Sequence, residues 1–138
     1  MADKMSIIVF SGTVDKLLPV GILASGGMAM GLDVEIFATF WGALAFRKGA
    51  AEREPRISKD FEDMGPMMMQ KMQEKGMQGW LETLRTAKEL GNVRVNVCAN
   101  TADLMDLKIE DFEDVVDEIV GVGEYVNMAK DAKITLFI

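Results

Sequence analysis

Apolar residues are grouped along this chain into short runs that are separated by stretches with helical periodicity. Met5 to Phe10 (MSIIVF) is a continuous apolar run, as expected for a strand covered on both faces in a parallel sheet. Asp33 to Thr39 and Val93 to Cys98 alternate in the manner of strands. Val115 to Gly121 is a shorter candidate strand, and Lys133 to Ile138 (KITLFI) is a last apolar one. The pattern therefore predicts five strands.

Helical patterns lie between these strands. A turn at Ser11-Gly12-Thr13 precedes a helix from about Val14 to Met30, which Gly31 ends. An amphipathic helix is predicted over Gln78 to Leu90, and another helix over Val122 to Lys130. The shorter helical segments are expected through residue 46, just after Cys98, and at residues 109–114. Strands that alternate with helices predict an α/β domain with a mainly parallel sheet.

Right-handed crossovers place the carboxyl end of every parallel strand at one edge of the sheet, where ligands usually bind. Ser11 to Thr13, Thr39 to Trp41, and Cys98 to Thr101 all follow strand ends. We therefore predict that one site contains Cys98 as its reactive group. The residues expected to form its pocket or to bind an anion are Ser11, Gly12, Thr13, Trp41, Asn100 and Thr101.

Cys98 is the only cysteine, and it lies between a strand end and a predicted helix start with Asn100 or Thr101 as N-cap. Backbone N–H groups and the positive end of a helix dipole favour a thiolate at such a position. The alternative is that Cys98 is a small buried apolar residue without reactivity. The sequence thus offers one candidate nucleophile.

Composition limits the chemistry that the chain can perform. Histidine is absent, which excludes Ser-His-Asp and Cys-His catalysis and removes the commonest transition-metal ligand. A single cysteine allows no internal disulfide and no zinc site of several thiolates, and it suits a reducing cytoplasm. The net charge of −7 argues against nucleic acid as a partner.

The amino terminus and one uncharged segment bear on localisation. The start, MADKMSIIVF, lacks the features of a secretory signal. Leu17 to Leu32 carries no charge but spans only 16 residues and contains Pro19 and four glycines, so we expect a buried helix rather than a membrane span. Gly26 and Gly27 would weaken that helix, which predicts close packing against the sheet or against another subunit. We expect a cytoplasmic protein.

Two central segments differ from the rest of the chain. Charges crowd between Arg47 and Asp63, which predicts a solvated and mobile insertion. Residues 64–77 hold six of the twelve methionines. We expect an adaptable lid or subunit contact, although thioethers can also bind Cu(I). The residues expected to be buried on assembly are Met67, Met68, Met69 and Met72.

Nothing in the sequence predicts a cofactor or a resident metal. Neither a G-x-G-x-x-G motif nor a Gly-Lys-Ser/Thr motif follows the first strand, so no nucleotide or flavin is expected. A flavodoxin-like binder of a small ligand stays an alternative. The acidic run from Glu110 to Glu118 is expected to be a solvated face, with a docking surface for a basic partner as the alternative.

Several segments together resemble the DsrE/DsrF-like family, in its DsrE-like, "peroxiredoxin-like" branch. The matching segments are IIVFSGTVDKLLPVGILASGGMAMG, VEIFATFWG, the methionine-rich middle, VNVCANTADLM and ITLFI. The resemblance implies one domain over residues 1–138, with a three-layer α/β/α sandwich around a five-stranded parallel sheet. It also implies a homo-oligomer, as a dimer, trimer or hexamer.

The resemblance implies that Cys98 carries sulfur as a persulfide. No second cysteine can resolve such an adduct within the chain, which favours a carrier that passes sulfur to a partner thiol over a self-contained enzyme. The alternative is an oligomeric binding or scaffold protein with an inert Cys98. The sequence departs from the family pattern at Asp106, where relatives usually have glycine, and at Gly121–Tyr125 (GVGEY).

Overall fold

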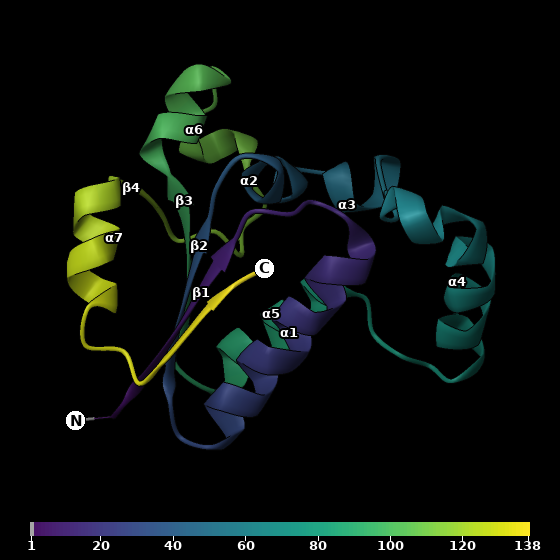
Figure 1. The fold of residues 1–138 in the computed structure, drawn as a ribbon, viewed down its shortest axis with the longest axis horizontal. Helices are drawn as coiled ribbons and strands as arrows, with labels where there is room; N and C mark the ends of the chain where they lie inside the picture. Colours follow the sequence, from purple (N-terminus) through teal and green to yellow (C-terminus); the bar gives the residue numbers. More distant parts are fainter. Residues whose placement is uncertain (1) are drawn as a thin grey trace.

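The computed structural model describes residues 2–138, which form a sheet of five parallel strands in the order β4-β3-β2-β1-β5. All five predicted strands are present. Their bounds are β1 Lys4–Val9, β2 Asp33–Ala38, β3 Val93–Cys98, β4 Glu118–Val120 and β5 Ile134–Phe137. Helices lie on both faces, so the fold is the expected three-layer α/β/α sandwich (Figure 1).

The order of the strands decides which helices cover which face. From β1 the chain steps through β2 to β3, and α1 (Val14–Ala29) and α5 (Trp80–Leu90) make these crossovers. Both helices therefore lie side by side on one face, as right-handed crossovers require. After β4 the chain returns across the sheet to β5, which places α7 (Val122–Ala129) on the opposite face (Figure 1).

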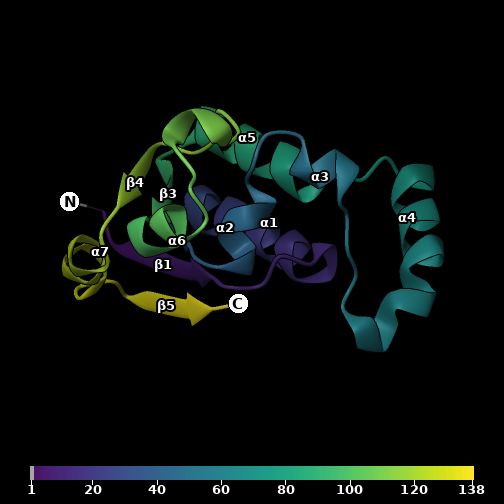
Figure 2. The ribbon, with the colours of Figure 1, turned by 90° about the horizontal axis from the view of Figure 1, so that it is seen from above.

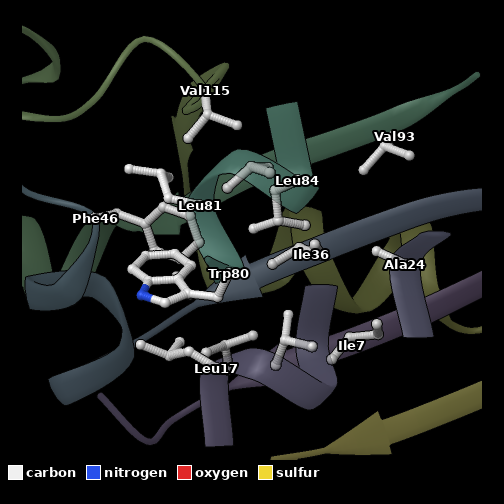
Figure 3. Close-up of a cluster of buried hydrophobic side chains, with 14 of the residues drawn as sticks. Ile7, Leu17, Ala24, Ile36, Phe46, Trp80, Leu81, Leu84, Val93 and Val115 are labelled. Carbon is white, nitrogen blue, oxygen red and sulfur yellow. The ribbon is translucent and has the colours of Figure 1, made fainter. Parts of the chain in front are cut away.

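The main core fills the space between the sheet and the two long helices. Ile7, Ile36 and Val95 come from the three central strands and are fully buried. The Trp80 ring meets the Phe46 ring edge-on, with centroids 5.0 Å apart, and closes one end of this core (Figure 3). The apolar pattern of the predicted helix Gln78–Leu90 thus marks the buried side of α5.

Helix α1 contains most of the uncharged segment Leu17–Leu32, which was predicted to be a buried helix, and it packs one side against the sheet. A Cβ at Gly27 would lie 3.1 Å from atoms of Met5 and Val34, so this glycine allows close contact with the sheet, as expected. Gly26 meets no atom within 4 Å and has no such role within the chain. Among the described residues, no helix has both the length and the apolarity needed to cross a bilayer.

Short helices follow two strand ends at the carboxyl edge, α2 (Trp41–Ala45) after β2 and α6 (Ala99–Leu104) after β3, and the 3₁₀ turn η2 (Ile109–Asp111) lies between α6 and β4. The predicted strand from Val115 to Gly121 is wrong at its start. Val115 and Val116 are buried in the main core but form a turn, and only Glu118–Val120 pairs with β3. Apolar residues alone did not distinguish a buried turn from a strand.

The charged segment contains α3 (Ala50–Arg53) and η1 (Lys59–Met64), and it leads into α4 (Gly65–Glu74), which carries most of the clustered methionines. Helix α4 stands apart from the sheet layers and packs chiefly on η1 (Figure 2). Within one chain Met67 and Met69 are exposed, whereas Met68 and Met72 are half-buried. Mobility of the segment and burial of these methionines on assembly stay predictions.

Candidate functional site

Cys98 is the last residue of β3 and also the N-cap of α6. Its backbone is extended (φ −62°, ψ 123°), and the helix starts at the next residue, Ala99. The prediction that Asn100 or Thr101 caps this helix is therefore wrong. Because both residues lie in the first helical turn, their backbone N–H groups point back toward the residue that precedes the helix.

These groups lower the pKa of the Cys98 thiol. Burial raises that pKa, but hydrogen bonds to the sulfur lower it by more. Their donors are the backbone N–H of Thr101, the hydroxyls of Thr39 and Thr101, and the backbone N–H of Asn100. Hydrogen bonds to sulfur favour the thiolate because they stabilise its charge. The pKa of Cys98 therefore lies below the ordinary value for a thiol.

The two threonines are fixed to each other and to the loop between β2 and α2. Their hydroxyl oxygens lie 3.2 Å apart, and the backbone N–H of Phe40 donates to Thr101 Oγ1 over 3.0 Å. Phe40 has φ +48°, a conformation that costs energy for a non-glycine residue and marks a constrained loop. The end of β2 and the first turn of α6 thus hold the two hydroxyl groups beside the thiol.

Sequence reasoning named Thr101 as a site residue, whereas it placed Thr39 at the same edge without including it in the site. The register pairs Ala38 with Val97, which brings the next residue on each strand, Thr39 and Cys98, side by side. The threonine at the end of the second predicted strand was a usable signal. It required knowing that β2 and β3 are neighbours, which the order of elements along the chain does not specify.

Apolar side chains enclose the other side of the thiol. Cys98 is 5% exposed and forms a small cluster with Phe37, Val120 and Tyr125 on the face that α7 covers. The Tyr125 ring stacks on Phe37 at 4.3 Å, and its hydroxyl lies 2.6 Å from Ser6 Oγ. Tyr125 of the unusual GVGEY stretch is therefore part of the wall beside the cysteine, a role that sequence reasoning left open.

The other predicted pocket residues lie elsewhere. Ser11, Gly12, Thr13 and Trp41 line a hollow of about 530 Å³ whose lining includes neither Cys98 nor Asn100 and Thr101. The reason is the direction of the side chains: Cys98 points to the face under α7, whereas the hollow lies over the start of α1 on the opposite face. One predicted site is thus two separate regions at the same edge.

A strap formed by residues 56–58 crosses the start of α1. The backbone N–H of Val14 donates to the carbonyl oxygen of Arg56 over 2.7 Å, and the Ser58 N–H donates to Asp15 Oδ1 over 2.9 Å. Burial raises the pKa of Asp15, but hydrogen bonds with Ser58 outweigh this and hold it below its usual value. The strap therefore occupies the Val14 N–H, one of the groups that a bound anion would need at this helix start.

The geometry can be compared with known proteins. The model of the DsrE/DsrF/DrsH-like family matches residues 1–61 and 51–137. The chain belongs to this family. An uncharacterized protein of Bacillus subtilis, YrkE, is 32% identical over 98% of this chain and 96% of its own length. A protein of Allochromatium vinosum named sulfur carrier protein DsrE2 is 31% identical, with 98% of each chain covered.

The solved structures agree on the fold. A protein of unknown function from Methanobacterium thermoautotrophicum, MTH1491, superposes with a TM-score of 0.60 at 16% identity, covering 99% of each chain. At that identity the likeness shows the fold alone. Within residues 2–138, no group of three or more Cys, Asp or Glu side chains is arranged to hold a metal ion.

Proposed function

We propose that this protein is a cytoplasmic sulfur carrier that holds sulfane sulfur as a persulfide on Cys98 and passes it to the thiol of a partner protein. Membership of the DsrE/DsrF/DrsH-like family and a relative named as a sulfur carrier support a role in sulfur relay. The observation that carries the proposal is the hydrogen-bonding around Cys98, because it lowers the pKa of an otherwise buried thiol.

The proposed transfer needs no change in overall oxidation state. The Cys98 thiolate attacks the outer sulfur of a donor persulfide, R–S–SH, which gives Cys98–S–SH and releases the donor thiolate. A partner thiolate then attacks the outer sulfur, and Cys98 leaves as a thiolate. The N–H and hydroxyl groups of Thr39, Asn100 and Thr101 would stabilise both the thiolate and the persulfide anion.

Sulfur transfer also requires that the donor and the acceptor reach Cys98. Because Cys98 is only 5% exposed, donor and acceptor must reach it through a movement of α6 or α7. Helix α7 is the more suitable element, since it has eight residues and buries only Tyr125. The same burial favours the alternative, a scaffold protein with an inert cysteine.

Loading experiments separate these two functions. Wild-type protein treated with polysulfide, or with a persulfide-loaded sulfurtransferase, should gain one sulfur atom by intact mass and lose it to an added thiol acceptor. Cys98→Ser should gain none, and Thr39→Val should load more slowly without unfolding. An unmodified wild-type protein, or equal loading of Cys98→Ser, would establish the scaffold alternative.

We also propose that the protein forms a homo-oligomer in which α4 is buried. The exposed Met67 and Met69 support this, because large apolar side chains gathered on one helix mark contact surfaces. Sedimentation should show a smaller species for Met67→Gln/Met69→Gln than for the wild type. Met30→Gln is the matched control, since Met30 is 82% exposed and lies outside this segment. Identical assembly of all three proteins would contradict the proposal.

A further inference from the structure

The hollow over the start of α1 is a second region of interest that the sulfur chemistry of Cys98 does not use. It has a volume of about 530 Å³ and lies among the first turn of α1, the segment from α2 to α3, and residues 54–58. This volume falls within the usual range for pockets that hold small organic molecules. Its size alone therefore permits a ligand.

The lining combines an apolar floor with an exposed aromatic ring. Leu17 is buried, Leu44 is half-buried, and the buried Trp80 separates the hollow from the main core. Trp41 also lines the hollow, yet it is 53% exposed. An indole left open beside an apolar floor offers a flat surface on which a planar group can stack. These walls suit a ligand with a flat apolar body.

The charges around the hollow oppose the charge of the whole protein. Lys16, Arg47 and Arg56 line it together with a single acid, Glu54, so three cations and one anion give a local charge of +2, whereas the chain carries −7. Glu54 is paired with Arg47 at 2.8 Å. Lys16 and Arg56 make no ion pair within residues 2–138. Two cations are thus left for a ligand.

We propose that this hollow binds a small organic anion with a flat apolar body. The negative group lies between Lys16 and Arg56, and the body lies against Trp41 and the floor. The hydroxyl of Ser11, which lines the same hollow, supplies a further hydrogen bond, whereas that of Thr13 is already bonded to Ser58. Because Cys98 is not part of the lining, this binding is independent of the proposed sulfur transfer.

Calorimetric titration of the full chain tests the proposal with AMP and 2-naphthoate, a phosphate and a carboxylate on flat bodies. Adenosine and 2-naphthol are the uncharged counterparts. At least one anion should bind at millimolar concentration or better, and its uncharged counterpart at least about fivefold more weakly. Both tryptophans of the chain line the hollow, so AMP binding should also change the intrinsic fluorescence.

Variants assign the binding to this place. Lys16→Gln/Arg56→Gln should weaken anion binding at least about fivefold. Lys130→Gln/Lys133→Gln removes the same charge from exposed positions outside the lining and should bind as the wild type does. Cys98→Ser should also bind normally, even if sulfur loading fails. The proposal would be overturned if neither anion binds or if the uncharged compounds bind equally well. It would also be overturned if Lys16→Gln/Arg56→Gln and Lys130→Gln/Lys133→Gln lose the same amount of anion binding.

Discussion

The side-chain oxygens of Thr39 and Thr101 lie 3.2 Å apart, and this contact ties the end of β2 to the first turn of α6 beside Cys98. The thiol is therefore flanked by one hydroxyl from its own helix and by a second from the end of the neighbouring strand β2. Any change that separates the two threonines should alter the thiol more than the fold. The first prediction tests this relationship.

Thr101→Val should make Cys98 less reactive. Thr101 is 1% exposed, and valine has nearly the same shape but lacks the hydroxyl that helps to lower the pKa and that accepts the Phe40 N–H. A single hydrogen bond to a charged group contributes about 1 kcal/mol or more, so alkylation by iodoacetamide at neutral pH should slow roughly fivefold. Thr101→Ser retains the hydroxyl and should react nearly as the wild type does; equal slowing of both variants would refute the role of the hydroxyl.

Cys98 should make stability depend on pH in the alkaline range. Its pKa in the folded chain lies below the ordinary 9.0, so the folded state favours the thiolate more than the unfolded state does. The resulting stabilisation is fully present above the unfolded pKa and is lost as pH falls through the folded pKa. Urea unfolding should therefore show that wild type gains stability relative to Cys98→Ser as pH rises toward 9.0. A constant difference between the two proteins would show that the thiol pKa is unshifted.

Tyr125→Phe should destabilise the chain because it leaves Ser6 without its partner. Ser6 is 1% exposed, and its hydroxyl lies 2.6 Å from that of Tyr125. An unpaired buried hydroxyl costs about 1–2 kcal/mol. Ser6→Ala in the same background should recover part of that loss, and urea unfolding of the four proteins measures the coupling. Strictly additive losses would mean that the two hydroxyls do not interact.

Gly42→Ala should be severely destabilising. A Cβ at this position would lie 2.1 Å from the carbonyl oxygen of Val9, which is backbone at the end of a central strand and cannot move aside. We expect a loss of about 3 kcal/mol. Gly26→Ala is the control, because nothing lies within 4 Å of its Cβ position and alanine favours a helix by up to about 1 kcal/mol. Thermal unfolding should thus move in opposite directions for the two variants.

Asp106→Gly should stabilise the protein. Asp106 ends α6 in the left-handed conformation (φ +55°), where the Leu107 N–H bonds the carbonyl of Ala102, as in a Schellman motif. Glycine adopts this conformation without steric cost, so the gain should be about 0.5–1 kcal/mol. Gly31→Ala is the reverse test at the end of α1, where φ is +83°, and should cost a similar amount. Denaturant unfolding measures both changes.

Local pattern was sufficient for the five strands in outline, for the long helices α1, α5 and α7, and for the position of the cysteine, but not for α3, η1 and α4 or for the start of β4. The apolar run of β1 and the helical periodicity of α5 both follow from which residues of that element are buried. Such a pattern can be recognised from the sequence alone. The contact between Ser6 and Tyr125 joins residues 119 positions apart, and no local pattern contains it. The strap at residues 56–58 holds α1 through backbone groups, which side-chain patterns do not reveal.

The division of the predicted site has a similar cause. Sequence order places Ser11–Thr13, Trp41 and Cys98 at one edge, but the face toward which each side chain points depends on where its strand ends. One residue more or less in β3 would reverse the direction of the thiol. Such a detail lies within the uncertainty of any strand boundary drawn from a sequence.

Helix α4 contributes few side chains to the core beneath the sheet, of which Met68 and Met72 are only half-buried. A change in the length of chain between residues 58 and 79 should therefore leave the register of the strands unchanged. A different helix in this segment would change the surface that α4 presents while Cys98 keeps its place at the end of β3.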